Sequence, residues 1–277
     1  IIATEMGHLD IITLLLNALP QNEKLNAIQH AKSDGETALI VATERNHIQI
    51  VAHLLQALPD REQKQNSINQ VDRKNRSALM YAIHHGRTEI TRLFLEAFVS
   101  TPNDLLAAIN LTDNDGQTGL VTAAYEGHAA IVETLLNSVP QDNKLAIINH
   151  ADRYGQTSLM AAARQGHTAT VKALLSTISQ NERVAAINHQ DNNGNTALTL
   201  AMHNPHTETS DILLNSAWEE DGTNSALRHA ATGGAIELLE EPPLLDGLTV
   251  FDANLAENLD HDTASESDDD AGPRLIG

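Results

Sequence analysis

The chain contains fourteen histidines, and histidine is the side chain that most often binds a transition metal. Six of them occupy two fixed positions of a pattern that recurs about every forty residues: His8, His47, His128, His167, His150 and His189. Equivalent histidines should then lie about one helix diameter apart, ~10 Å, whereas the ligands of a zinc ion lie about 2 Å from it. We therefore predict a structural, helix-capping role for these histidines and no metal site.

Other residues that could perform catalysis form no recognisable motif. The sequence has no glycine-rich phosphate loop, no H-E-x-x-H and no G-x-S-x-G. Acidic pairs such as Glu219-Glu220 and Glu240-Glu241 are adjacent at expected helix ends, where solvated charge is ordinary. We predict that the chain is not an enzyme and needs no cofactor. The alternative is a regulatory region that selects substrate for a catalytic domain outside this chain.

The pattern that contains the histidines repeats along most of the chain. The pair Gly166-His167 returns every 39 to 41 residues, as Gly7-His8, Asn46-His47, Gly86-Arg87, Gly127-His128 and Pro205-His206. Landmarks at so even a spacing predict a solenoid, in which each unit packs on its neighbours and no single central core exists.

Each unit is expected to contain a turn and three short helices. In one unit the turn runs from Asp152 to Gly155, Thr157 opens the first helix and Gly166 ends it. A second helix follows, with apolar residues at helical spacing. Four prolines are expected to end second helices: Pro20, Pro59, Pro102 and Pro140. A third helix should be anchored by one isoleucine per unit: Ile28, Ile68, Ile109, Ile148 and Ile187.

These units resemble the ankyrin repeat, whose pattern is a D-x-x-G turn, T-P-L-H, an alanine-rich helix, Gly-His and I-V-x-x-L-L. One unit matches that pattern at Asp152, Gly155, Thr157, Leu159, Ala162, Ala163, Gly166, His167, Val171, Leu174 and Leu175. The resemblance implies an all-α fold: an ankyrin-repeat solenoid of stacked helix-turn-helix units, here with an extra short helix per repeat. Asn75 and Pro205 replace glycines that adopt a positive φ, which asparagine tolerates and proline does not.

The length of the units adds a further expectation. They are about six residues longer than the usual 33. Long units of this kind are similar to those in ankyrin proteins of intracellular bacteria, which are often secreted into host cells. The resemblance therefore implies a cytoplasmic protein, or an effector that acts in the cytosol of a host cell.

The array is predicted to cover residues 1–240. Its first unit is truncated, because Ile1-Ile2-Ala3 matches the middle of a first helix, and we expect that residues upstream are missing from this sequence. The last unit, about 224–239, is shortened as a C-terminal cap should be. Residues 241–277 carry ten acidic residues and one basic residue, Arg274, and are predicted to form an acidic, largely disordered tail.

The charge of the chain limits its partners. Its 17 basic and 37 acidic residues give a net charge of −20, which repels nucleic acids and anionic membrane surfaces. No apolar run approaches the about 18 residues of a membrane-spanning helix. No cysteine is present for a disulfide or a thiolate metal site. We expect no nucleic acid and no membrane as partner, and a monomer that binds another protein.

In the ankyrin family, partners contact the turn tips and the exposed ends of the first helices. The resemblance therefore implies a concave binding face with basic and aromatic residues at these positions: Arg73, Lys74, Arg76, His84, His85, Tyr125, Arg153, Tyr154 and Arg164. We predict a protein-protein interaction scaffold whose partner presents an acidic or phosphorylated segment. The acidic tail could compete for the same face. The alternatives are a solvated face without a partner and a purely architectural spacer.

Overall fold

The computed structural model describes residues 1–203 and 207–217. All of them belong to the first of two compact units of the chain, Ile1–Gly234, and the second is Ala235–Gly277. Three predictions fall outside the described residues: the altered loop at Pro205, the shortened last unit at 224–239 and the acidic tail at 241–277.

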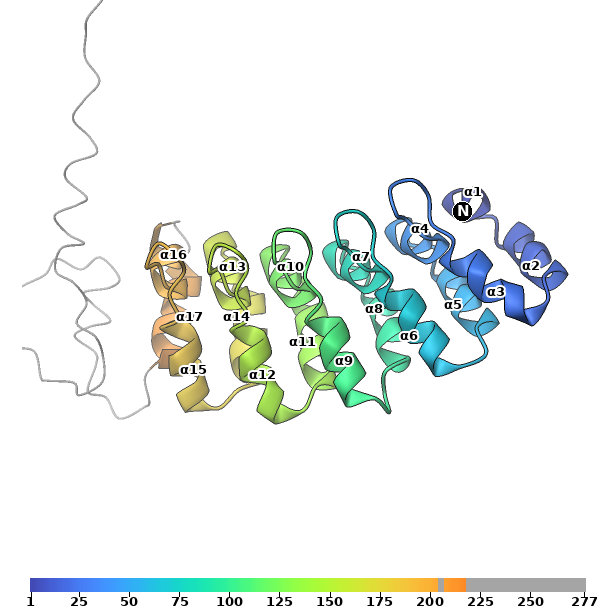
Figure 1. The fold of residues 1–277 in the computed structure, drawn as a ribbon. Helices are drawn as coiled ribbons and strands as arrows, with labels where there is room; N and C mark the ends of the chain where they lie inside the picture. The colour runs from blue at the N-terminus through green and yellow to red at the C-terminus, as the bar shows by residue number, and fades with distance from the viewer. Residues whose placement is uncertain (204–206, 218–277) are drawn as a thin grey trace, which may run out of the picture. The chain divides into compact units, whose positions relative to one another are not determined.

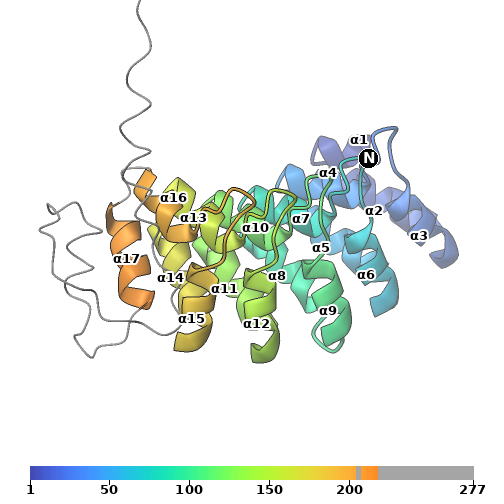
Figure 2. The ribbon, with the colours of Figure 1, turned by 60° about the vertical axis from the view of Figure 1, so that its left-hand side comes forward.

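The described residues form 17 helices and no β-strand, so the predicted all-α fold is confirmed. The helices are arranged in three rows, and each of the first five units contributes one helix to every row, whereas the last described unit contributes a first and a second helix (Figure 1; Figure 2). The first helices are α1 (Ile2–Glu5), α4 (Ala38–Glu44), α7 (Ala78–His84), α10 (Gly119–Tyr125), α13 (Ser158–Gln165) and α16 (Ala197–His203). The second helices are α2 (Leu9–Ala18), α5 (Ile48–Ala57), α8 (Thr88–Glu96), α11 (Ala129–Ser138), α14 (Thr168–Ser176) and α17 (Thr207–Ala217). The third helices are α3 (Gln21–Gln29), α6 (Arg61–Asn69), α9 (Pro102–Ile109), α12 (Gln141–Ile148) and α15 (Gln180–Ile187).

The first helices are short, and α4, α7, α10 and α13 are largely enclosed. A hydroxyl group opens each of four of them by accepting the amide of the residue three positions later, at 3.3–3.4 Å, in Thr37, Ser77, Thr118 and Thr157. Small residues such as Ala42, Ala82 and Ala162 are 0% exposed. Neighbouring first helices therefore pack closely, and this row sets the spacing between units.

The second and third helices cover the first helices and are half solvated. In α5 the buried residues Ile50, Val51, Leu54 and Leu55 recur at helical spacing, as predicted for an amphipathic helix. The third helices are anchored by the predicted isoleucines, each at most 3% exposed: Ile28, Ile68, Ile109, Ile148 and Ile187. The extra helix of each unit is thus a packed part of the array.

The prolines also have a role that was not predicted. Pro20 and Pro140 are the N-caps of third helices, and Pro102 is the first residue of α9. Leu19, just before Pro20, is extended with ψ 139°, as expected for a residue that precedes proline. The prediction that proline ends the second helix is wrong at Pro102, because α8 ends at Glu96. Proline is favoured at the first helical position, where its missing amide costs nothing.

Candidate partner-binding surface

The turn tips of five units lie in a row, at residues 32–36, 72–76, 113–117, 152–156 and 191–195. Main-chain hydrogen bonds join each tip to the preceding one, with N···O distances of 3.0, 3.1, 3.3 and 3.0 Å: Arg73 to Asp34, Asn114 to Lys74, Arg153 to Asp115 and Asn192 to Tyr154. The side-chain amides of Asn114 and Asn192 add bonds of 3.1 Å to the carbonyls of Arg73 and Arg153. The predicted tips therefore form a continuous, internally braced surface.

An aspartate shapes four of these tips. Its Oδ1 accepts the amides two and four residues later, at 2.8–3.0 Å, in Asp72, Asp113, Asp152 and Asp191. In the tip at 32–36 Lys32 replaces this aspartate, and its ammonium group pairs with Glu36 and Asp34. The side chains that point outwards are therefore presented by a turn with a defined conformation.

The tip at 72–76 presents three of the predicted binding residues in different ways. Arg73 and Lys74 are exposed, and neither makes an ion pair with any residue that the structure describes. Arg76 is half-buried, and its Nη2 lies 3.4 Å from Oδ2 of the buried Asp113. Two cationic side chains of this tip are open to a partner, while the third joins neighbouring units.

Asparagine replaces the usual glycine in this tip. Asn75 has a φ of 60°, so the predicted left-handed conformation is confirmed. Its side-chain amide donates to the carbonyl of Thr112 in the next unit. The Tyr81 hydroxyl donates to Asp72 Oδ2 at 2.8 Å, and burial together with this bond raises the pKa of Tyr81. Both contacts hold the tip at 72–76 in place.

The tip at 152–156 combines a cation with an aromatic ring. The guanidinium of Arg153 lies 4.8 Å from the centre of the Tyr154 ring, and its Nη2 donates to the Tyr154 hydroxyl at 2.8 Å. The same group pairs with Asp115 of the preceding tip at 2.7 Å. Arg153 is therefore held by its own chain, and it orients Tyr154, which is 56% exposed.

The ends of α7 and α10 carry the predicted His84, His85 and Tyr125. His84 Nδ1 lies 3.7 Å from a carboxylate oxygen of Glu126, and the two histidine rings meet edge to face. Burial lowers the pKa of His85, and the neighbouring His84 and Arg87 lower it further. Tyr125 is 45% exposed. The three residues lie near each other. Among them, Tyr125 is the one that exposes an aromatic ring to a partner.

Arg164 lies at the exposed end of α13 and acts on the last described tip. Burial alone would raise the pKa of Asp191, but hydrogen bonds from the side chain and amide of Asn195 and from the Asn193 amide outweigh it. The charge of Arg164 adds to this effect, and the net result is a lowered pKa for Asp191. Arg164 thus also helps to stabilise a tip.

Family models for ankyrin repeats match this sequence in three segments. A model of three copies matches residues 1–104 and 99–184, and a model of many copies matches residues 159–214. The chain belongs to the ankyrin-repeat family. The three matches together cover nearly all of the array that the structure describes, and ankyrin repeats are in general modules for binding other proteins.

Two histidines of the ankyrin units, His128 and His167, connect neighbouring units. The carbonyl of His84 accepts a hydrogen bond from His128 Nε2 at 3.2 Å, and the carbonyl of Tyr125 accepts one from His167 Nε2 at 2.9 Å. Arg87, at the same position, donates to the carbonyl of Glu44 at 3.4 Å. The predicted helix-capping role is wrong for His128 and His167, whose side chains bind the preceding unit and do not cap their own helices. Sequence reasoning about one unit could not identify partners that lie more than forty residues away.

Two further classes of site are absent from the described part of the ankyrin array. No group of three or more His, Asp or Glu side chains there is close enough to hold a metal ion. No helix in that part combines the length and the apolar character needed to cross a bilayer. The remaining candidate is the surface formed by the tips and the ends of the first helices.

Proposed function

We propose that this ankyrin array is an interaction scaffold that binds an acidic or phosphorylated segment of another protein along its row of tips. The observation that carries the proposal is the contrast within the tip at 72–76. Arg73 and Lys74 are exposed without an ion pair among the described residues, whereas the neighbouring Arg76 is paired with Asp113. A carboxylate or phosphate would supply the counter-charge that Arg73 and Lys74 lack.

The aromatic side chains extend this surface. Tyr125 and Tyr154 are both about half exposed, and tyrosine is enriched among the residues that dominate binding energy at interfaces. Tyr154 is oriented by Arg153, so less conformational entropy is lost when a partner covers the ring. The Tyr154 ring and the open cations at Arg73 and Lys74 lie on the same row of tips. This arrangement favours an extended peptide segment as the ligand.

The setting in which such a scaffold would act is a separate part of the proposal. The long units are similar to those of ankyrin proteins of intracellular bacteria, and we extend the proposal to a monomeric effector in the cytoplasm or in a host-cell cytosol. The second candidate is a substrate-selecting region of an enzyme whose catalytic domain lies outside this chain. This second candidate would use the same row of tips, but the bound partner would be chemically modified after binding.

The proposal is tested by selecting peptides from a random display library on the 277-residue protein, with counter-selection on the Arg73→Ala/Lys74→Ala variant. Acidic peptides should be enriched, and phosphorylation of serines in them should tighten binding. Enrichment of neutral or basic peptides, or equal recovery on both proteins, would show that the open cations do not define the ligand.

A further inference from the structure

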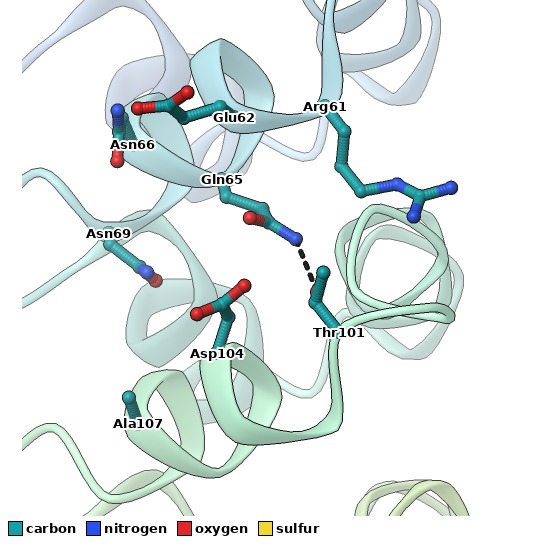
Figure 3. Close-up of a pocket in the computed structure, with 8 residues that line it drawn as sticks. All are labelled: Arg61, Glu62, Gln65, Asn66, Asn69, Thr101, Asp104 and Ala107. Carbon is teal, nitrogen blue, oxygen red and sulfur yellow. Dashed lines mark hydrogen bonds between the residues drawn. The ribbon is translucent and has the colours of Figure 1, made fainter.

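A second polar site lies away from the tips, between the third helices α6 and α9. It is a groove of about 530 Å³, lined on one side by Glu62, Gln65 and Asn69 and on the other by Thr101 and Asp104. Figure 3 shows the Glu62 and Asp104 carboxylates on opposite sides of it, and the side chain of Asn69 directed towards Asp104. The groove is open to solvent and rich in hydrogen-bond acceptors.

Residue types that are specific to α6 create this groove. The residue three positions before the anchoring isoleucine is apolar in four units and polar in one: Leu25, Leu106, Leu145 and Val184 against Gln65. Gln65 is nevertheless buried, at 7% exposed. A buried glutamine at a position that is otherwise apolar carries a desolvation cost, which its hydrogen bonds must offset. It therefore indicates a local requirement that the other units do not share.

The connection to the next unit differs at the same place. In α3, α12 and α15 the first residue donates from its side-chain amide to a carbonyl at the end of the next second helix, at 2.9–3.0 Å: Gln21 to Ala57, Gln141 to Thr177 and Gln180 to Ser216. Arg61 takes that position in α6. Gln65, one turn further along, makes the bond instead, to the Ala97 carbonyl at 2.9 Å and to Thr101 Oγ1 at 2.7 Å. The first turn of α6 lacks the usual connection, and its side chains line the groove.

The Glu62 and Asp104 carboxylates make no ion pair with any residue that the structure describes, although Arg61 and Asn66 also line the groove. Asn69 Oδ1 is buried and has no hydrogen-bond partner among the described residues. The guanidinium of Arg61 is directed away from the carboxylates of Glu62 and Asp104 (Figure 3). Asn149, at the position of Asn69 in a later unit, also has an unpartnered Oδ1. Among the described third helices, however, only α6 has both an unpartnered asparagine Oδ1 and a glutamine, Gln65, three residues before its anchoring isoleucine.

We propose that the groove between α6 and α9 is a second docking site that binds an arginine or lysine side chain of a protein partner. The cationic head would lie between the Glu62 and Asp104 carboxylates. Anionic groups are disfavoured by the two carboxylates. This site is chemically opposite to the open cations at Arg73 and Lys74, and its existence does not depend on the function proposed for the tips.

The experiment is an NMR titration of the ¹⁵N-labelled 277-residue protein with three capped tripeptides, Ala-Arg-Ala, Ala-Lys-Ala and Ala-Glu-Ala. The arginine and lysine peptides should shift the amide signals of residues 61–69 and 101–107 in a saturable way, and the glutamate peptide should not. In Glu62→Gln/Asp104→Asn the dissociation constant for the arginine peptide should rise at least about tenfold, because two charge-assisted contacts are lost. Asp142→Asn removes the carboxylate at the position of Glu62 in α12 and should change nothing.

A second variant separates recognition from folding. Gln65→Leu installs the residue type of the other units, and circular dichroism should show that the fold is intact while the shifts of residues 61–69 are lost. Arg73→Ala/Lys74→Ala should keep the full response, because the tips do not take part. The proposal is overturned if the glutamate peptide gives the same shifts, if Glu62→Gln/Asp104→Asn binds unchanged, or if the shifts lie elsewhere.

Discussion

Two tips of this array have the same backbone but use their cations differently. In both, an aspartate at the first position accepts the same two amides, and a main-chain bond leads to the preceding tip. At 72–76 two cationic side chains remain open, whereas at 152–156 Arg153 is paired with Asp115 and covers Tyr154. The comparison shows that a basic residue at a tip can remain open or can organise the surface around it.

The two tips also differ in how much space they leave for a side chain at their fourth position. Asn75 provides the left-handed residue at 72–76, and its side chain connects to the next unit. Gly155 provides it at 152–156, where an added Cβ would lie 2.7 Å from the Asn192 main-chain nitrogen. The first tip has space for a side chain at this position, and the second is closed by its neighbour.

The largest expected effect tests this difference in space. Gly155→Asn should lower the free energy of unfolding by about 1–3 kcal/mol more than Gly194→Asn, because the added Cβ at 155 meets main-chain atoms that cannot move aside. Gly194 has a similar φ of 81°, and a Cβ added there would meet no atom of the described residues within 4 Å. The measurement is urea unfolding of both variants, and equal losses would show that the tip at 152–156 is not closed in this way.

The second effect concerns the open cations. Arg73→Ala/Lys74→Ala should weaken binding of an acidic peptide by about tenfold or more, since each lost charge-assisted contact contributes about 1.5–3 kcal/mol before screening. The free energy of unfolding should change by less than about 0.5 kcal/mol, because both side chains are exposed and make no ion pair within the described residues. Fluorescence anisotropy and urea unfolding measure the two quantities. A large loss of stability would mean that these cations hold the array together.

The opposite pattern is expected for Arg153. Its ion pair and its contact with Tyr154 are exposed to solvent and contribute little, so Arg153→Ala should reduce stability slightly, but more than Arg73→Ala/Lys74→Ala does. Affinity for an acidic peptide should fall less than about threefold, because Asp115 already neutralises this guanidinium. An affinity loss as large as that of the Arg73→Ala/Lys74→Ala variant would remove the distinction between the two tips.

The smallest effect is a dependence of stability on pH at the neighbouring tip. The pKa of Asp191 is lowered in the folded protein by its hydrogen bonds and by Arg164. Its carboxylate therefore stabilises the fold above the ordinary aspartate pKa of about 3.9, and this contribution is lost as pH falls through the lower folded-state pKa. Wild type should lose stability more steeply than Asp191→Asn below about pH 4.5. Parallel curves from thermal unfolding would exclude this contribution.

The sequence was sufficient to predict the units, because their contacts are local or repeat with the period. The anchoring isoleucines, the hydroxyl caps and the positive φ of Asn75 all follow from residue type and spacing within one unit. The role of proline at Pro102 was missed because the segment after Glu96 is longer than in other units, so the second helix ends well before it.

Contacts between units could not be predicted from the same pattern. Whether Arg76 reaches Asp113, or Arg153 reaches Asp115, depends on how far each unit is shifted relative to the next. Basic residues at four tip positions therefore looked equivalent in sequence, and the structure separates them into open and paired groups. The groove beside Gln65 was missed for the same reason, since its walls belong to two units.

The most direct test of the binding surface is a charge swap at the open tip. The Arg73→Glu/Lys74→Glu protein is titrated with an acidic peptide selected on wild type and with the same peptide carrying lysine in place of its acidic residues. We predict that the acidic peptide loses binding and that the lysine peptide recovers it, because recognition rests on opposite charge at this tip. Undiminished binding of the acidic peptide to the swapped protein would contradict the account.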